Sequence, residues 1–298
     1  MTQSKKHRNN VGVIGLGIIG TRVAAGLRHS GFSTYVWNRT PKPAPNFLGS
    51  PAEVAGQCEI LQLFVADAHA VMQTIDALAE ALTPEHIIVC SATIGLEGTL
   101  DAAKRVRQLG ARFLDAPFTG SKGAADRRQL VYYVGGEDGD FLRVQPILEA
   151  TSKAIVHIGE VGQAAVVKVV TNLISAATTQ ALAEALAIVR RAGVRPEVFA
   201  EAVEHNAIRS GVTDLTLPAM ISGDFTPHFA LKHMFKDVQL GIQLANQFDL
   251  DVPVTGTVGG VMYGALSNGW GNLDYSALEK AYDTAKLPPV IEQPPDGK

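Results

Sequence analysis

The sequence predicts an α/β fold, in which a doubly wound N-terminal domain is joined by a long helix to an all-α C-terminal domain. In the first half of the chain, short β-branched runs alternate with amphipathic stretches, a pattern typical of βαβ units and a parallel sheet. From Gly162 onward the sequence reads as helices only. The chain has 298 residues, more than one hydrophobic core usually organises, so two domains are expected.

The N-terminal domain is predicted to span residues 9–162. Its candidate strands are short and rich in β-branched residues, and Gly31 and Gly110 follow two candidate helices, where a left-handed cap is favoured. The predicted strands are 11–14, 34–37, 60–64, 87–90, 112–115, 131–135 and 154–158. Helical stretches are predicted between them, for example 19–29, 68–82 and 96–109.

A long interdomain helix is predicted at residues 163–192. The segment is apolar, but Lys168, Asn172 and Glu184 interrupt it, and no apolar run reaches the roughly 20 residues that span a bilayer. We therefore expect a buried helix of a soluble protein, followed at 193–290 by a helical substrate and dimerisation domain. The predicted helices there are 196–204, 232–247, 253–267 and 275–285, with flexible tails at 1–8 and 291–298.

The composition argues against several classes of partner. The formal net charge is −3 and the basic residues are scattered, whereas a nucleic-acid or anionic-membrane surface concentrates them on one face. Cys58 and Cys90 lack the spacing of a zinc site or a redox pair, so we interpret them as buried reduced thiols. The first residues lack the apolar core of a signal peptide. A cytoplasmic protein that binds neither nucleic acid nor membrane is expected.

The first predicted strand runs directly into a glycine-rich loop, and a predicted helix follows it. This is the GxGxxG fingerprint of dinucleotide-binding Rossmann domains in its required context, which favours a cofactor site over a plain structural turn. Its first glycine permits a tight turn, its second lets a pyrophosphate approach, and its third allows close packing of helix on strand. The helix N-terminus offers N–H groups to the phosphates. The loop consists of Gly15, Leu16, Gly17, Ile18, Ile19 and Gly20.

The end of the second predicted strand indicates which dinucleotide binds. An NAD-preferring site usually has an acidic residue there for the ribose 2′-hydroxyl, but this strand ends in Asn38, Arg39 and Thr40. A guanidinium and a hydroxyl favour a 2′-phosphate instead, although a solvated loop arginine is the alternative. We therefore predict NADP(H) as the cofactor, and we also assign Val65, directly after the third predicted strand, to its site.

Two further segments are candidates for the chemistry. After the strand 112–115, Thr119 and the N–H groups around Gly120 and Ser121 could hold a substrate carboxylate, or the loop could be a structural turn. On the long helix, Lys168 and Asn172 have the i, i+4 spacing that places both on one face. Valines surround Lys168, so desolvation could lower its pKa toward neutrality, as a general acid/base requires. A snorkelling lysine is the alternative.

The third candidate segment is 229–237, FALKHMFKD, in the helical domain. Lys232 and Lys236 again have the i, i+4 spacing, and Asp237 could pair with a neighbouring cation, although a solvated helix face is the alternative. No cluster of His, Asp and Glu has ligand spacing, so no metal is predicted. The histidines are interpreted as surface or packing residues; those considered are His205, His228 and His233.

The order of these motifs resembles the β-hydroxyacid dehydrogenase family, which includes 3-hydroxyisobutyrate dehydrogenases and glyoxylate/succinic semialdehyde reductases. The resemblance extends from Val11 to about Ala285. It is carried by GLGIIG at 15–20, SATIG at 91–95, DAPFTGSKGAA at 115–125, GxxGQAAVVKVVTN at 159–172, FALKHMFKD at 229–237 and GWGNLDYSA at 269–277.

The resemblance implies a role for each matching residue. Lys168 corresponds to the catalytic acid/base, and Asn172 orients the substrate oxygen. Lys236 corresponds to a second lysine near the nicotinamide and the substrate, and Thr93 lines the cofactor. The loop residues Thr119, Gly120 and Ser121 match the substrate-anchoring Ser-Gly-Gly loop, and Asn38, Arg39 and Thr40 match the NADP-preferring members.

Two residues depart from the family loop. Thr119 replaces the usual serine but keeps the hydroxyl, so substrate anchoring should survive. Ser121 replaces the third glycine, and this form is similar to the NADPH-dependent glyoxylate/succinic semialdehyde reductases, although the added side chain could also reshape the pocket for another acid.

The family mechanism implies a hydride transfer between NADPH and a small carboxylate-bearing aldehyde, keto acid or β-hydroxy acid. Two other classes stay open. Imine reductases share the fold and the Trp-Asn-Arg-Thr loop but usually lack the lysine, and a non-catalytic NADPH-binding module would bind the cofactor without turnover. The apolar, small-residue long helix and the family together imply a homodimer or homotetramer.

Overall fold

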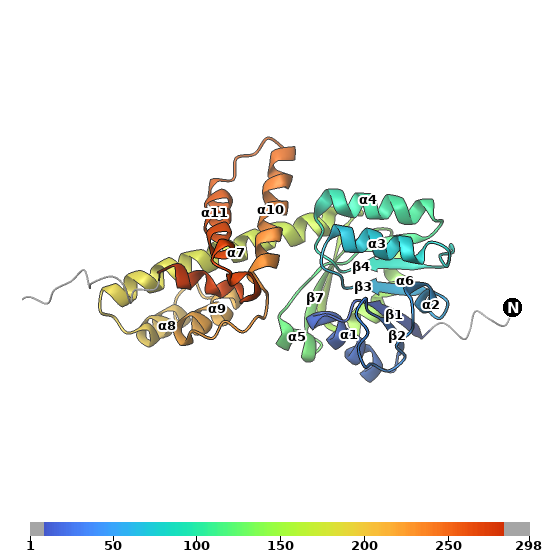
Figure 1. Ribbon diagram of the computed structural model, residues 1–298, viewed down its shortest axis with the longest axis horizontal. Coiled ribbons are helices and arrows are strands. Elements are labelled where there is room, and N and C mark those ends of the chain that lie inside the picture. Colours follow the sequence, from blue (N-terminus) through green and yellow to red (C-terminus); the bar gives the residue numbers. More distant parts are fainter. Residues whose placement is uncertain (1–8, 283–298) are drawn as a thin grey trace, which may run out of the picture. The chain divides into compact units, whose positions relative to one another are not determined.

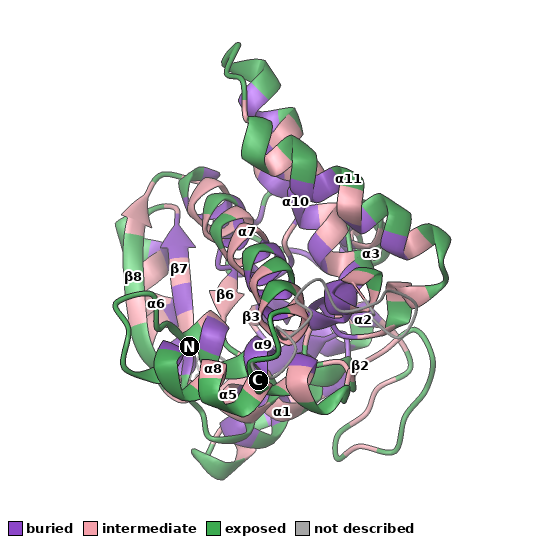
Figure 2. Ribbon diagram, turned by 90° about the vertical axis from the view of Figure 1, so that its left-hand side faces the viewer, coloured by how far each residue is buried: buried purple, intermediate pink, exposed green. Residues whose placement is uncertain are grey.

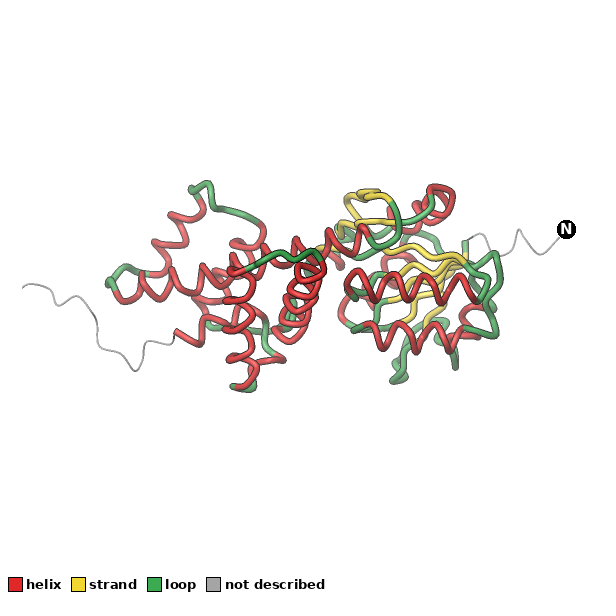
Figure 3. The backbone as a smooth tube through the Cα atoms, turned by 90° about the horizontal axis from the view of Figure 1, so that it is seen from above, coloured by secondary structure: helices red, strands yellow, loops and turns green. Residues whose placement is uncertain are grey.

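The computed structural model describes residues 9–282, and the chain divides into two compact units, residues 1–169 and 170–298 (Figure 1). The division falls within the long helix α7 (Gln163–Arg191), so the predicted connecting helix contributes residues to both units. All of the named strands belong to the first unit (Figure 3). The predicted flexible tails, and the end of the predicted helix 275–285, lie outside the described residues.

An eight-stranded mixed sheet forms the centre of the first unit. The strand order is β2-β1-β3-β4-β5-β7-β6, and β8 pairs with β7. This confirms the doubly wound α/β class of the prediction. The strands are β1 (Asn10–Ile14), β2 (Ser33–Trp37), β3 (Ile60–Leu63), β4 (Ile87–Cys90), β5 (Arg112–Asp115), β6 (Phe118–Thr119), β7 (Leu130–Gly135) and β8 (Ser152–Gly159).

The sheet is parallel from β2 to β5 but mixed beyond β5, which corrects the expectation of a parallel sheet. Strand β7 runs antiparallel to β5 and to β6, whereas β8 is parallel to β7. The reason is the connection after β5: it holds only the two-residue β6 and the five-residue helix α5 (Lys122–Asp126). A parallel return usually needs a longer crossover helix. Strand β8 has no buried residue, in contrast to the largely buried β7 (Figure 2).

Helices cover both faces of this sheet. Alternate residues of β1 and β4 contribute to two separate hydrophobic clusters, one under α2, α3 and α4 and the other under α1, α5 and α6. Strand β6 was not predicted, and no bounds were predicted for α2, α5 and α6. Strand β6 and the helices α2 and α5 span too few residues to show a period, and α6 contains Pro146. The helices are α1 (Ile18–His29), α2 (Pro51–Ala55), α3 (Ala68–Leu78), α4 (Gly95–Gln108) and α6 (Asp138–Glu149).

The second unit is helical, as predicted. Its core consists of two clusters, one around Met234 and Met262 and one around Leu186 and Leu217. Helix α9 was not predicted because its polar and apolar residues do not segregate clearly, although Ser210 forms a capping box at its start. The elements after α7 are α8 (Pro196–Glu204), α9 (Gly211–Ser222), α10 (Leu231–Gln247), α11 (Pro253–Ser267) and two 3₁₀ helices, η1 (Trp270–Asn272) and η2 (Tyr275–Tyr282).

Helix α7 is long and apolar enough to cross a membrane by length and composition alone. Leu173 and Ala176 pack in one core cluster of the second unit, and Leu182 and Leu186 in the other. A core helix of a globular domain meets the same criterion, and this packing is that of a core helix.

Both cysteines are free and buried, as the sequence predicted. Burial raises the pKa of Cys58 and of Cys90 to about 12, so both are protonated thiols at neutral pH. Their packing role in the first core cluster is consistent with this.

Candidate functional site

The glycines of the loop after β1 serve distinct steric purposes. Gly15 has a φ of +99°, and a side chain there would clash with the carbonyl oxygen of Phe64. A side chain at Gly20 would clash with the carbonyl oxygen of Gly15. Gly17, in contrast, has no atom within 4 Å of the Cβ position. Two glycines are therefore required by packing, while the third leaves open space at the start of α1.

The N-terminus of α1 has no side-chain cap. It has neither a capping side chain nor an acidic residue in its first turn, so its N–H groups and partial positive charge are available to an anion. The side-chain oxygen of Asn38 accepts a hydrogen bond of 2.8 Å from the Leu16 N–H, which ties the end of β2 to the glycine loop. The ammonium of Lys42 donates to the Leu16 carbonyl at 2.6 Å.

Lys42 was missed by the sequence analysis. It follows Thr40 by only two positions, so the sequence shows a cation near the end of β2. Its contact with the glycine loop, however, depends on the path of the folded backbone. It places a second cation beside the loop, in addition to Arg39.

A cavity of about 340 Å³ adjoins the glycine loop. Six of the predicted cofactor residues line it, namely Gly15, Gly17, Asn38, Arg39, Thr40 and Val65. Further lining residues come from the end of β3 and from α3 and were not predicted; they include Phe64, Asp67, His69 and Gln73. The predicted residues Leu16, Ile18, Ile19, Gly20, Thr93 and Lys236 are not among its lining.

The open space at Gly17, the uncapped α1 and the cations at Arg39 and Lys42 fit a dinucleotide with its phosphates on the loop. The residues from α3 also reach this site, because β3 lies beside β1 and runs parallel to it, so the carboxyl ends of both strands lie at the same edge of the sheet. Sequence spacing alone does not reveal that neighbour.

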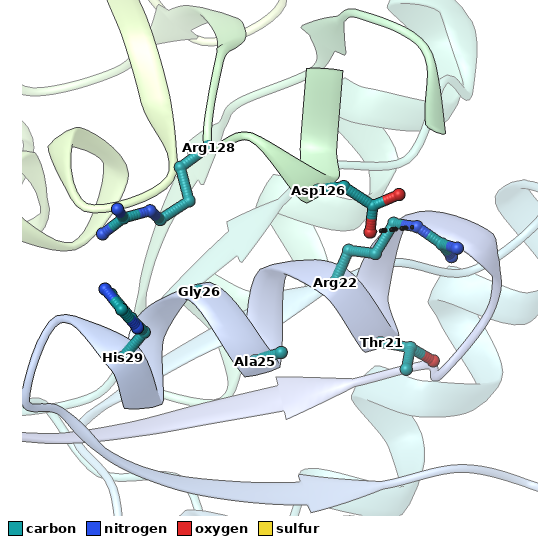
Figure 4. A pocket seen from close by; sticks show the side chains of 7 residues that line it. All are labelled: Thr21, Arg22, Ala25, Gly26, His29, Asp126 and Arg128. Atoms are coloured by element: carbon teal, nitrogen blue, oxygen red, sulfur yellow. Dashed lines mark ion pairs between the residues drawn. The ribbon is translucent and has the colours of Figure 1, made fainter. Parts of the chain in front are cut away.

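A second cavity, of about 520 Å³, lies alongside α1 and reaches α5 (Figure 4). Arg22, His29, Asp126 and Arg128 line it, and the Arg22 guanidinium forms an ion pair with Asp126 at 2.8 Å. None of the predicted site residues takes part. The predicted cofactor residues therefore lie at the cavity beside the glycine loop and not at this one.

The predicted carboxylate-binding loop lies between β6 and α5. Thr119 is the last residue of β6 and pairs with Val131, and Gly120 has a φ of +134°. The Ser121 hydroxyl caps α5 by accepting a hydrogen bond of 3.4 Å from the Ala124 N–H. The three residues are contiguous and partly exposed, and the hydroxyl of Ser121 already has a structural use.

Asp115, the first residue of the family-like loop motif, is buried at 2% exposure. Its Oδ2 accepts a hydrogen bond of 3.0 Å from the Ala165 N–H at the start of α7. Burial raises the pKa of Asp115 to about 6, although backbone N–H groups of Gly162, Ala165 and Ala164 oppose the shift. No role was predicted for Asp115 from the sequence.

Lys168 lies on α7, half-buried, with Val169 buried beside it. Asn172 follows one turn later and is 7% exposed. Its side-chain amide donates a hydrogen bond of 2.5 Å to Oδ2 of Asp237 on α10. The amide of Asn172 is therefore held in a fixed orientation.

Asp237 accepts hydrogen bonds from two polar residues of the second unit, Asn172 and Lys236. It is 1% exposed, and while Oδ2 accepts from Asn172, Oδ1 accepts a hydrogen bond of 2.7 Å from the Lys236 ammonium. A solvated helix face is therefore wrong for this part of α10. Lys232, one turn before Lys236, is exposed and donates to Asn272 instead.

Comparison with known families matches nearly all of the described chain. Residues 10–159 match the family described as the NAD binding domain of 6-phosphogluconate dehydrogenase. Residues 162–282 match the family described as NAD-binding of NADP-dependent 3-hydroxyisobutyrate dehydrogenase. Together the two matches cover both units.

Individual proteins with related names are similar to this chain in sequence and structure. Glyoxylate/succinic semialdehyde reductase 2 of Arabidopsis thaliana is 28% identical over 93% of this chain and 80% of its own length. L-threonate dehydrogenase of Cupriavidus necator is 27% identical over 95% and 99%. The crystal structure of 3-hydroxyisobutyrate dehydrogenase from Salmonella typhimurium superposes with a TM-score of 0.84 at 27% identity, covering 91% of this chain and 99% of that one.

Proposed function

Because the chain belongs to the β-hydroxyacid dehydrogenase family of NAD(P)-dependent oxidoreductases, we propose that it transfers a hydride between NADPH and a small carboxylate-bearing aldehyde, keto acid or β-hydroxy acid. The glyoxylate/succinic semialdehyde and 3-hydroxyisobutyrate types are the proposed substrate class. Relatives carrying those names support this choice.

The proposal of NADPH rests on the end of β2. Arg39 and Thr40 line the cavity beside the glycine loop, and no acidic residue stands at the strand end to bind a ribose 2′-hydroxyl. Lys42 adds a positive charge close by. The family matched by residues 162–282 is itself described as NADP-dependent.

In the proposed mechanism Lys168 is the general acid/base. When bound, the reduced nicotinamide supplies the hydride to the carbonyl carbon. Lys168, as an ammonium, gives a proton to the carbonyl oxygen, and in the oxidative direction the neutral amine accepts the hydroxyl proton. Thr119 and the N–H groups of Gly120 and Ser121 hold the substrate carboxylate.

The observation that carries the assignment is the buried carboxylate of Asp237. It holds the amide of Asn172 one helical turn beyond Lys168 and also pairs with Lys236. Side chains of a catalytic or binding site are held in a productive geometry by such supporting hydrogen bonds. We therefore propose that Asn172 orients the substrate oxygen and that Lys236 contributes charge to the substrate and nicotinamide.

Replacement of the proposed acid/base tests this function. Lys168→Ala should lower kcat by about 10²–10⁴-fold, the usual contribution of a general acid/base, while the Kd for NADPH, measured by fluorescence titration, stays near wild type. Lys104→Ala, at an exposed position on α4, is the matched control and should retain full activity. A fully active Lys168→Ala enzyme would refute the assignment.

The substrate panel separates the remaining classes. Glyoxylate, succinic semialdehyde, tartronate semialdehyde and 3-hydroxyisobutyrate should be assayed with NADPH or NADP⁺ beside a cyclic imine. Turnover of the acids supports the proposal. Preferential reduction of the imine would instead assign an imine reductase, and tight NADPH binding without any turnover would assign a non-catalytic module.

A further inference from the structure

Asp115 is a buried carboxylate that the proposed mechanism does not use. It is the last residue of β5 and pairs in register with Gly135 of β7. A side chain at Gly135 would clash with Oδ1 of Asp115, so the neighbouring strand has a glycine where the carboxylate needs room. The carboxylate of Asp115 therefore occupies the space that a side chain at Gly135 would take.

The carboxylate of Asp115 accepts hydrogen bonds from the start of α7. Oδ2 accepts a hydrogen bond of 3.0 Å from the Ala165 N–H, and the N–H groups of Gly162 and Ala164 also favour its charged form. The first N–H groups of a helix have no partner within the helix. Here the Ala165 N–H donates to the side chain of Asp115, which lies 50 positions earlier in the sequence at the end of a central strand of the sheet.

Two parts of the proposed site adjoin this one residue. Toward the C-terminus, Asp115 leads through Ala116 and Pro117 into β6, which ends at Thr119 of the carboxylate-anchoring loop. Through its hydrogen bond, it holds Ala165, which lies three positions before Lys168 on α7. All of these residues belong to the first unit.

We propose that Asp115 is a positioning residue, whose carboxylate fixes the first turn of α7 against the end of β5 and thereby sets the separation between Lys168 and the Thr119 loop. It touches neither substrate nor cofactor in this role. The inference rests on the proposed acid/base role of Lys168. It extends that role by naming the residue that couples the proton donor to the substrate anchor.

Removal of the carboxylate should affect the chemical step more than binding. Without an acceptor the first turn of α7 can shift, and a displacement of about 1 Å at a catalytic group can cost about 10²-fold in rate. Asp115→Ala is therefore expected to lower kcat by about 10–100-fold with a much smaller change in KM. Asp115→Asn keeps an acceptor oxygen and should restore kcat to within about threefold of wild type.

A matched control separates positioning from general destabilisation. Asp140 is also a buried carboxylate of the first unit, at 6% exposure, and it pairs with Arg112 at 2.9 Å rather than with α7. Asp140→Ala should leave kcat and KM near wild type when assayed well below its melting temperature. An equal loss of kcat in Asp140→Ala would overturn the positioning role.

A double-mutant cycle gives the sharpest readout. If Asp115 acts through Lys168, then Asp115→Ala should cost little once the lysine is absent, because residues that act as a unit are not additive. We expect Lys168→Ala and the Asp115→Ala/Lys168→Ala double variant to agree in kcat within about twofold. Losses that multiply would overturn the inference, as would wild-type kcat in folded Asp115→Ala.

A replacement variant and a comparison of outcomes complete the test. If Asp115→Ala does not fold, Asp115→Ser replaces it, since its hydroxyl is too short to reach α7 and the same loss of kcat is expected; full activity would overturn the proposal. A fully active Lys168→Ala enzyme would refute the proposed function itself. An inactive Lys168→Ala enzyme beside a fully active Asp115→Ala enzyme would remove the positioning role alone.

Discussion

Arg39 lies at the end of β2, exposed, on the cavity beside the glycine loop. Its guanidinium can meet a phosphate through two hydrogen bonds. Because hydrogen bonds to charged groups contribute about 1.5–3 kcal/mol, Arg39→Asp should lower the NADPH-to-NADH ratio of kcat/KM by about 10–100-fold. Steady-state kinetics with both cofactors measures the ratio. Arg107→Asp, at an exposed site on α4, should not alter it, and an unchanged ratio in Arg39→Asp would contradict the NADPH proposal.

Asp115 makes a separate prediction about stability. Burial raises its pKa from the usual 3.8 to about 6, so the folded state favours the protonated form. That contribution to stability is present at low pH and is lost as the pH rises through about 6. In Asp115→Asn the amide does not titrate, so between about pH 4 and pH 8 the free energy of unfolding should shift in favour of the variant by about 2–3 kcal/mol. Urea unfolding across this range measures the shift, and a difference independent of pH would contradict it.

The loop between β1 and α1 makes a prediction at the scale of an element. Gly17 has open space and an extended backbone, with φ −73° and ψ −163°, so Gly17→Ala should fold normally but place a methyl group where the phosphates approach. NADPH affinity should fall about tenfold or more with the melting temperature unchanged. Gly20→Ala should instead destabilise the fold by about 1–3 kcal/mol, the usual cost of overpacking.

Calorimetry and NADPH titration of both variants distinguish the two glycines. Equal losses of stability in Gly17→Ala and Gly20→Ala would show that the whole loop is a packing turn. Equal NADPH binding by Gly17→Ala and wild type would place the phosphates elsewhere.

Most elements were predicted from the sequence, and the failures have local causes. The predicted helices 196–204 and 253–267 agree with α8 and α11 at both ends, because each begins at a proline and ends where apolar periodicity stops. Strand β6 was not predicted, and no bounds were predicted for the helices α2 and α5, because two to five residues cannot display a period. The predicted helix 68–82 ends early, at Leu78 in α3.

At the scale of the whole molecule, the two units each have their own core, and the long helix has residues in both units. Large apolar side chains remain exposed on the second unit, among them Ile174, Ile188, Val254 and Tyr263. Exposed apolar residues of this kind are consistent with a subunit interface. The expectation of a homodimer or homotetramer stays a prediction.

The sequence by itself determined the glycine loop, the basic end of β2 and the helical spacing of Lys168 and Asn172. These are short-range properties, since a strand, a glycine turn and a helix each place neighbouring residues through backbone geometry alone. Only the tertiary structure decided which polar groups are partners. Asp237 accepts a hydrogen bond from Asn172, 65 positions away in the sequence, and Asp115 accepts one from Ala165, 50 positions away. A buried carboxylate needs a hydrogen-bond donor, and sequence spacing does not show which donor the fold brings to it.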